Sequence, residues 1–308
     1  MTIIKACGSI GDIEKGKQIH DEIMGRGFLE TDAVLGTALL DMYAKCGELA
    51  KAHNLLEELP SRDIVSWNCM LSGCIQHADF ELVLECFELM QGEGITPNVV
   101  SWSALIAGYV QNEWSQKALL FLEQMQHSGL SPNVVTYLSL LKACGKMDWV
   151  ERGQELHAEI VEEEFNLDLF VGSSLVHMYV KFGMLDEARD ILDSLPERDI
   201  VSWTALITGY SEHGHNEEAL KCFVQMQAEG VFPNAVTIHC VLKSCSTLQA
   251  IKKGQEIHTM IKGNKLLLDH FVCSMLVDMY ARCGSLATAQ KAFDKLRDSF
   301  MDDVIDWI

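Results

Sequence analysis

One ten-residue phrase occurs twice in the chain, as LPSRDIVSWN at residues 59–68 and as LPERDIVSWT at residues 195–204. The Ser-Trp pair near its end occurs again at residues 101–102, and an Asp-Trp pair occurs at 306–307. The tryptophans of these pairs lie at positions 67, 102, 203 and 307, with gaps of 35, 101 and 104 residues. The gap of 101 residues is the sum of two units of 35 and one of 31. Because a fixed internal period is produced by repeated copies of one small structural unit, the chain is predicted to be an array of units of 31 and 35 residues.

Cutting the chain at these joints defines the units by residue number. They are a partial unit at 1–32, then 33–63, 64–98, 99–133, 134–168, 169–199, 200–234, 235–269 and 270–303, and the start of another at 304–308. Both ends cut through a unit, which predicts a piece of a longer protein. The position of a residue is counted below from the first residue of its unit.

The unit 200–234 indicates what each repeat folds into. Apolar residues recur at i, i+3, i+4 and i+7 from Trp203 to Tyr210, which is the spacing of one helix face. The polar stretch EHGHN interrupts this pattern, and a second apolar stripe runs from Ala219 to Met226 before Gly230 ends it. Each unit is therefore predicted to be a helix-turn-helix hairpin. One hairpin cannot cover its own apolar faces, so stacking is predicted to give an all-α solenoid with a continuous core.

Composition limits the function in two ways. The chain has a net charge of −20, from 24 basic and 44 acidic residues, which argues against binding nucleic acid by bulk phosphate attraction. No apolar run approaches the roughly 18 to 20 residues that span a bilayer, so no membrane association is expected. The start, MTIIKACGSI, has the features of neither a signal peptide nor a transit peptide.

Eleven cysteines raise the question of disulfides or zinc. The chain contains no CxxC pair, which argues against a zinc ribbon or a redox motif. Cys46 and Cys283 stand at the same position of their units, and Phe182 stands at that position in unit 169–199. A position that accepts either cysteine or phenylalanine is a packing position, so we expect buried thiols in a reducing compartment.

The unit sequences resemble the pentatricopeptide repeat family in its plant PLS subclass. The 35-residue P-type pattern is seen in IVSWTALITGYSEHGHNEEALKCFVQMQAEGVFPN, the L-type in LLKACGKMDWVERGQELHAEI and the 31-residue S-type in GTALLDMYAKCGELAKA. Tetratricopeptide repeats, the other helical-hairpin class considered, keep a steady period of 34 residues. The resemblance covers the whole chain and implies a right-handed superhelix that binds single-stranded RNA, with no cofactor and no catalytic activity.

The resemblance implies that two side chains of each unit read one base. They are the residue at position 5 and the last residue of the unit, and in the family their identities select the base. The implied pairs and bases are Thr37/Asp63 (G), Asn68/Asn98 (pyrimidine), Ser103/Asn133 (A), Ser173/Asp199 (G), Thr204/Asn234 (A) and Ser274/Asp303 (G). The pairs Leu138/Asp168 and His239/Asp269 fall outside the family's code, so the predicted RNA is 5′-GYAnGAnG-3′. Independently of the family, Asp or Asn at the end of a unit is expected to cap the next helix.

The residue at position 2 is apolar in every unit. In the family it clamps between successive bases, and the alternative is ordinary packing against the adjacent repeat. The clamping residues implied here are Val34, Val65, Val100, Val135, Phe170, Val201, Val236 and Phe271. Position 13 of the S-type units is basic, as Lys45, Lys181 and Arg282, and these side chains are candidates for phosphate contacts or for ordinary solvated positions.

Many PLS proteins end in a zinc-dependent cytidine deaminase domain, whose signature is H-x-E followed by P-C-x-x-C. The chain contains H-x-E at His20 and at His157, but no P-C-x-x-C follows, and the corresponding His258 lacks the glutamate. We therefore expect these histidines to be structural, the metal and cofactor content to be none, and the chain not to be an enzyme. His213 and His215, two apart in a turn, are weak evidence for a metal site.

The resulting prediction is the RNA-targeting part of an organellar RNA-editing (C-to-U) or RNA-processing factor. Its partners would be single-stranded mitochondrial or chloroplast RNA and other editing factors. The alternative function is a protein-binding scaffold of the tetratricopeptide type, which the acidic charge would suit.

Overall fold

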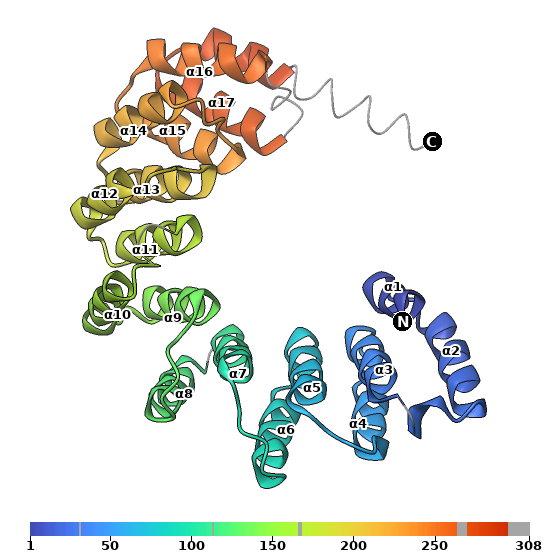
Figure 1. Ribbon diagram of the computed structural model, residues 1–308. Helices are drawn as coiled ribbons and strands as arrows, with labels where there is room; N and C mark the ends of the chain where they lie inside the picture. The colour runs from blue at the N-terminus through green and yellow to red at the C-terminus, as the bar shows by residue number, and fades with distance from the viewer. Residues whose placement is uncertain (31, 113, 166–167, 264–269, 295–308) are drawn as a thin grey trace, which may run out of the picture. The chain divides into compact units, whose positions relative to one another are not determined.

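The computed structural model describes residues 1–30, 32–112, 114–165, 168–263 and 270–294. The regular elements in these ranges are helices, which alternate along the chain between a first and a second helix of a hairpin (Figure 1). The first helices are α1 (Thr2–Ile10), α3 (Ala33–Lys45), α5 (Ile64–Gln76), α7 (Val99–Gln111), α9 (Val134–Met147), α11 (Leu169–Lys181), α13 (Ile200–Glu212), α15 (Ala235–Thr247) and α17 (His270–Arg282). The second helices are α2 (Ile13–Gly25), α4 (Leu49–Glu58), α6 (Phe80–Gly92), α8 (Ser115–His127), α10 (Val150–Glu162), α12 (Leu185–Ser194), α14 (Asn216–Ala228) and α16 (Ile251–Gly263), and a short 3-10 helix, η1, covers Phe28–Glu30.

The chain forms two compact parts, an N-terminal part (Met1–Ala143) and a C-terminal part (Cys144–Ile308). In the N-terminal part α3 contacts α1 and α5, and α5 contacts α7. In the C-terminal part α13 contacts α11 and α15, and α15 contacts α17. First helices thus pack on first helices in each part, and α1, α3, α5, α7, α11, α13 and α15 also pack on the second helix of their own hairpin. This arrangement confirms the predicted all-α solenoid class in each part.

The helix boundaries coincide with the joints proposed from the sequence. Helices α3, α5, α7, α9, α11, α13, α15 and α17 begin at the first residue of a proposed unit. The two unit lengths differ in the second helix, because α4 and α12 of 31-residue units have 10 residues whereas α6 and α14 of 35-residue units have 13. A shorter second helix therefore accounts for most of the difference.

Close approach of successive first helices requires glycine at one recurrent position. A Cβ built on Gly73 in α5 would lie 2.5 Å from the Cβ of Ala44 in α3, and one on Gly209 in α13 would lie 2.7 Å from Val180 in α11. Both distances are shorter than real Cβ contacts. Gly73 and Gly209 are the tenth residues of units 64–98 and 200–234, so glycine at the same position of the unit permits close helix contact in both parts.

The cysteines behave as core side chains. All eleven are free thiols, and none of them is classed as exposed. The sulfur atoms of Cys46 and Cys283 lie against the carbonyl oxygens of Cys7 and Cys245, at 3.9 and 3.7 Å. Burial raises the pKa of Cys245 to about 12. Seven of the eleven are buried, as a packing role predicts, and the reducing compartment stays a prediction.

The histidines of the H-x-E sequences connect adjacent hairpins. Nδ1 of His20 lies 2.9 Å from the hydroxyl of Tyr43, and Nδ1 of His157 lies 2.9 Å from that of Tyr179. His258, which lacks the glutamate, makes the same contact with a tyrosine at the same distance. Burial lowers the pKa of His20 and of His157. The prediction that these histidines are structural is confirmed.

The buried tryptophans differ in how the indole N–H is satisfied. Trp203 Nε1 donates to Glu229 Oε2 at 3.2 Å. Glu93 stands at the corresponding place of unit 64–98, but it pairs with Arg62 at 2.9 Å, and in the described part of the chain Trp67 Nε1 is buried without a hydrogen-bond partner. The two glutamates thus form a natural comparison, one bound to a buried donor and the other not.

Glu229→Ala is expected to lower the free energy of unfolding by about 1–3 kcal/mol, because it leaves the buried N–H of Trp203 unsatisfied and removes an ion pair with Arg198. Glu93→Ala removes only the ion pair with Arg62 and is expected to cost about 0–1 kcal/mol. Urea unfolding followed by circular dichroism measures both. Equal losses in the two variants would contradict a contribution from the tryptophan bond.

Candidate nucleic-acid interface

A row of apolar side chains lies exposed at the start of the first helices. The second residue of each helix is between 50% and 67% exposed in α3, α5, α7, α9, α11, α13, α15 and α17. These residues are Val34, Val65, Val100, Val135, Phe170, Val201, Val236 and Phe271. Side chains exposed to this degree can be reached by a ligand. Phe271 also lies 5.1 Å from the ring of His239 in the adjacent repeat, so exposure and packing occur together there.

In the described part of the chain, the last residue of a unit caps the helix that follows. Asp63 Oδ1 accepts hydrogen bonds from the backbone N–H groups of Val65 and Ser66, at 3.1 and 2.9 Å. Asn234 Oδ1 accepts from the N–H of Thr237 at 2.8 Å. The same cap is formed by Asn98, Asn133, Asp168 and Asp199. The expected N-capping role is confirmed, and each cap occupies one side-chain oxygen.

In the N-terminal part, two predicted reading pairs are in contact. Asn68 Nδ2 donates to Asn98 Oδ1 at 3.3 Å, and Ser103 Oγ donates to Asn133 Oδ1 at 3.1 Å. Position 5 of a first helix therefore touches the cap residue of the next first helix. The contact lies beside the exposed residue at position 2 of that next helix.

In the C-terminal part, one pair is in direct contact and one is bridged. Ser173 Oγ donates to Asp199 Oδ1 at 3.3 Å. Thr204 Oγ1 lies 2.7 Å from the hydroxyl of Thr237, which in turn donates to Asn234 Oδ1 at 2.9 Å. The pair Thr204/Asn234 is thus connected through a third side chain.

The remaining readable pairs are not brought together in this way. Thr37 Oγ1 donates to the carbonyl of Ala33 in its own helix, at 3.0 Å, while Asp63 serves as a cap. Ser274 Oγ donates to the carbonyl of Phe271 at 2.8 Å. Its predicted partner, Asp303, lies outside the described residues.

The L-type pairs lack a polar contact of this kind. The ring of His239 lies 5.1 Å from the ring of Phe271, tilted by 34°, and its Nδ1 is buried without a hydrogen-bond partner within the described ranges. Asp269 lies outside those ranges, and Leu138 carries no hydrogen-bonding group. A ring contact is thus present at His239, whereas Leu138 offers no polar group to a base.

Two of the three predicted phosphate-binding cations are already paired. Lys45 Nζ lies 2.6 Å from Asp41, and Arg282 Nε lies 2.8 Å from Asp278, each one helical turn away. Lys181 is exposed. Since an adjacent carboxylate offsets the charge of a cation, Lys45 and Arg282 should attract a phosphate less strongly than an unpaired lysine or arginine would.

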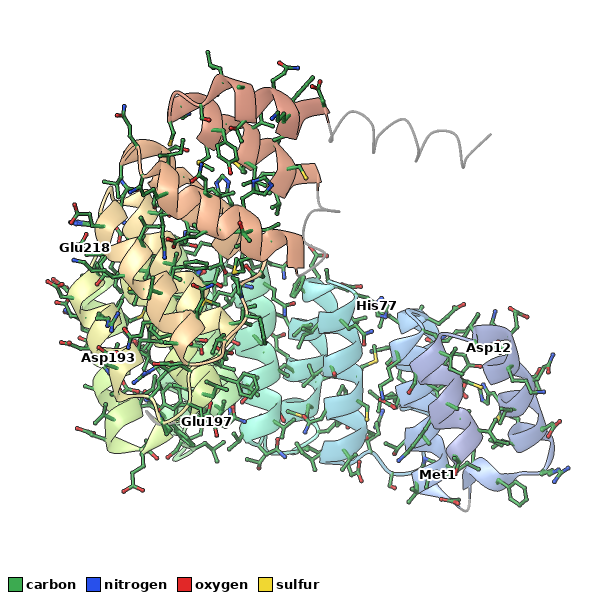
Figure 2. The ribbon with its side chains drawn as sticks, turned by 90° about the horizontal axis from the view of Figure 1, so that it is seen from above. Met1, Asp12, His77, Asp193, Glu197 and Glu218 are labelled. Carbon is green, nitrogen blue, oxygen red and sulfur yellow. The ribbon has the colours of Figure 1, made fainter. Side chains whose placement is uncertain are left out.

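The second helices carry many of the acidic side chains. Asp186 and Glu187 lie in the first turn of α12, and Glu217 and Glu218 lie in the first turn of α14, where they favourably face the helix dipole. Figure 2 shows Asp193 and Glu218 at the outer edge of the hairpins, pointing away from them. The net negative charge thus arises largely on helices other than those that bear positions 2 and 5.

Sequence reasoning missed the hydroxyl group at position 3. Ser101, Thr136 and Thr237 are fully buried, and the hydroxyl of each lies between position 5 of the preceding unit and the cap residue. The available signal was the recurrence of Ser or Thr directly after position 2. A serine in the first turn of a helix is also typical of a capping box, so the letter alone does not identify this contact.

Within the described ranges, no three His, Cys, Asp or Glu side chains lie close enough together to hold a metal ion. His213 Nδ1 lies 2.9 Å from the carbonyl of Gly209, whereas the ring of His215 packs edge-on against Tyr210. The two neighbouring histidines therefore make separate contacts. In the same ranges, no helix is both long and apolar enough to cross a membrane.

Helical hairpins stacked in this way define an α-solenoid in each part. Family models described as "PPR repeat family" match residues 62–111, 97–146 and 198–247, and models described as "PPR repeat" match residues 1–28, 37–64, 135–165 and 173–200. The chain belongs to the pentatricopeptide repeat (PPR) family.

Similar proteins in Arabidopsis thaliana carry the same family name. One, named chloroplastic, is 32% identical over 99% of this chain and 43% of its own length. A second is 44% identical over 96% of this chain and 36% of its own length, and a third, named mitochondrial, is 32% identical over 96% and 41%. The chain thus spans well under half the length of these relatives.

Solved structures agree on the fold. The crystal structure of the maize protein PPR10 matches with a TM-score of 0.59 at 19% identity, covering 96% of this chain and 48% of that one. PPR10 in complex with an 18-nucleotide psaJ RNA element matches with a TM-score of 0.55 at 20% identity, covering 94% and 48%. At this identity the likeness establishes the solenoid fold.

Proposed function

We propose that the chain is a sequence-specific binder of single-stranded RNA that reads one base per unit. The observation that carries this proposal is the contact of position 5 with the cap residue, beside exposed apolar side chains that can stack on bases. Stacking surfaces alternating with pairs of donors and acceptors are what recognition of splayed-out bases requires. The RNA complex of PPR10, whose fold the chain shares, supports the same use of the surface.

The hydrogen bonds at Ser173 and Asp199 favour guanine. The Ser173 hydroxyl donates to Asp199 Oδ1, which also accepts the N–H of Ser202. The lone pairs of Ser173 Oγ and the second carboxylate oxygen of Asp199 remain, and both are acceptors. The Watson–Crick edge of guanine offers two neighbouring donors, N1–H and N2–H, to meet them.

The hydrogen bonds at Thr204 and Asn234 favour adenine. Asn234 Oδ1 accepts both the N–H and the hydroxyl of Thr237, so the amide nitrogen Nδ2 is the group left for a base. Since the single hydroxyl hydrogen of Thr237 is donated to Asn234, Thr204 donates to Thr237 and offers a lone pair. One donor and one acceptor match N1 and N6–H of adenine.

Taken unit by unit, the proposed target is 5′-GYAnGAnG-3′, with the units divided at the residues where first helices begin. The third base is read by Ser103 and Asn133, the fifth by Ser173 and Asp199, and the sixth by Thr204 and Asn234. The alternation of 31- and 35-residue units supports the PLS subclass. On that basis we assign the chain to the targeting part of a C-to-U RNA-editing or RNA-processing factor that acts with other editing factors. Relatives named chloroplastic or mitochondrial support an organellar location.

Binding to the eight-base RNA is expected to be at least about tenfold tighter than to a scrambled RNA of the same composition, a difference of about 1.4 kcal/mol. The salt dependence is expected to be shallow, because two of the three candidate cations are paired with aspartate. Three phosphate contacts to a single strand give a slope of about −2 in log K against log salt. Fluorescence anisotropy over a salt series measures both quantities. Equal affinity for both RNAs would instead favour the protein-binding scaffold.

A further inference from the structure

A buried hydroxyl stands behind two of the proposed adenine sites. Thr237 Oγ1 lies 2.7 Å from Thr204 Oγ1 and 2.9 Å from Asn234 Oδ1. At the other site, Thr136 Oγ1 lies 2.8 Å from the hydroxyl at position 5 and 3.1 Å from the cap amide oxygen. Thr136 and Thr237 have no solvent exposure, so neither can touch RNA itself.

A serine takes the same place behind the proposed pyrimidine site. Ser101 Oγ donates to Asn68 Oδ1 at 2.7 Å and lies 3.1 Å from Asn98 Oδ1. Ser101 is also fully buried. It also accepts from the backbone N–H of Asn98 at 3.2 Å and so takes part in a capping box as well. A hydroxyl therefore contacts both reading side chains at each of the three units that end in asparagine and have a readable pair.

After units that end in aspartate, the described bonds of the position 3 hydroxyl go to the backbone of the cap residue alone. Ser66 Oγ accepts from the N–H of Asp63 at 3.0 Å and donates to its carbonyl at 2.8 Å. Ser202 Oγ makes the same two bonds with Asp199, at 3.1 and 3.0 Å. These hydroxyls bond to the backbone of the cap residue and serve the capping box.

The residue type at position 3 of a unit varies with the type of reading pair in the preceding unit. Ser or Thr at position 3 follows each unit whose position 5 is Thr37, Asn68, Ser103, Ser173 or Thr204. After the L-type units 134–168 and 235–269, whose position 5 lies outside the code, position 3 is apolar, as Val171 and Val272, and it is also apolar, as Leu35, after the partial unit 1–32. A helix cap alone does not account for this division, because Asp32 and Asp168 cap helices that have no such hydroxyl.

We propose that the hydroxyl at position 3 of the following unit is a third specificity determinant, which orients the reading pair of a unit that ends in asparagine. It rests on the proposed RNA function. Thr237 holds the amide of Asn234 with its oxygen inward and its Nδ2 outward, and it takes the hydroxyl hydrogen of Thr204. Without the hydroxyl, only the backbone N–H of Thr237 holds the amide oxygen of Asn234, and Thr204 regains a donor, so a pattern that accepts guanine becomes accessible. Thr237 is thus a positioning residue that acts through two side chains facing the base.

The test uses Thr237→Val, which keeps the shape of the side chain and removes the hydroxyl. The ratio of Kd values for RNA with G and with A at the sixth base is expected to fall by about tenfold, in keeping with one buried hydrogen-bond network. Thr237→Ser restores a hydroxyl and is expected to restore the ratio. The matched control is Ser202→Ala. It removes the corresponding hydroxyl behind Asp199, which bonds only to the backbone of Asp199. This change is expected to leave the preference for G at the fifth base unchanged.

A ratio of affinities measured on one preparation is independent of how much protein is folded, so a loss of stability does not imitate the effect. If wild type prefers A at the sixth base and Thr237→Val keeps that preference in full, the third determinant is disproved while the RNA function stands. If wild type shows no preference at any base, the proposed function and this inference both fail.

Discussion

Exchanging Thr204→Asn and Asn234→Asp together is expected to change the preferred sixth base of the RNA from A to U. Asparagine at position 5 can donate through Nδ2, and aspartate at the end of the unit offers a carboxylate oxygen. These groups match the O4 acceptor and N3–H donor of uracil and no longer match adenine. The pair Asn68 and Ser101, with 2.7 Å between their oxygens, is a precedent in this chain for asparagine beside a position 3 hydroxyl.

The expected swing in relative affinity between the A and U forms of the RNA is about 10- to 100-fold, which corresponds to roughly 1.4–2.7 kcal/mol. The measurement is a competition gel shift with the two RNAs at about 150 mM salt, where non-specific phosphate attraction is largely screened. The third base supplies the internal control, since Ser103 and Asn133 are unchanged and replacing that A by U should weaken wild type and variant alike. A variant that still favours A at the sixth base, with the third-base effect intact, would show that the assignment of units to bases is wrong.

Much of the fold could be predicted from the sequence because it depends on local rules. The spacing of Trp67, Trp102 and Trp203 fixes the unit length, and Asp or Asn before each first helix marks its beginning through a capping bond made within three residues. Signals of this kind are carried by neighbours in the chain and are readable there.

The details of the candidate site depended on contacts between units and were less accessible. An apolar letter in the first turn of a helix, such as Val201, suits both an exposed and a packed side chain, and its 57% exposure is visible only in the structure. The bond between Thr204 and Thr237 joins residues 33 apart in sequence. Whether Ser101 turns toward Asn68 or toward its own cap is likewise a matter of side-chain geometry that the letters do not encode.

Trp203→Ala is expected to lower the stability of its own and the adjacent hairpins by about 3–5 kcal/mol, the usual cost of truncating a fully buried tryptophan. Trp203 has no solvent exposure, its ring lies 5.7 Å from the Arg189 guanidinium, and its N–H is bound by Glu229. The matched control is Trp114→Ala, since Trp114 is 47% exposed and its removal should cost about 1 kcal/mol or less.

The position of the loss matters as much as its size. In a solenoid each repeat is stabilised by its neighbours, so Trp203→Ala should speed hydrogen exchange first in α13 and in the helices it contacts, α11, α14 and α15. Ser173 lies in α11 and Thr204 in α13, and Asp199 and Asn234 directly precede α13 and α15. Selectivity at the fifth and sixth bases, which these residues read, should therefore fall as well. Selectivity at the third base, read in the N-terminal part, should persist. Uniform loss of protection and of selectivity along the whole chain would mean that the array unfolds as one cooperative unit, and that its bases are not read by independent hairpins.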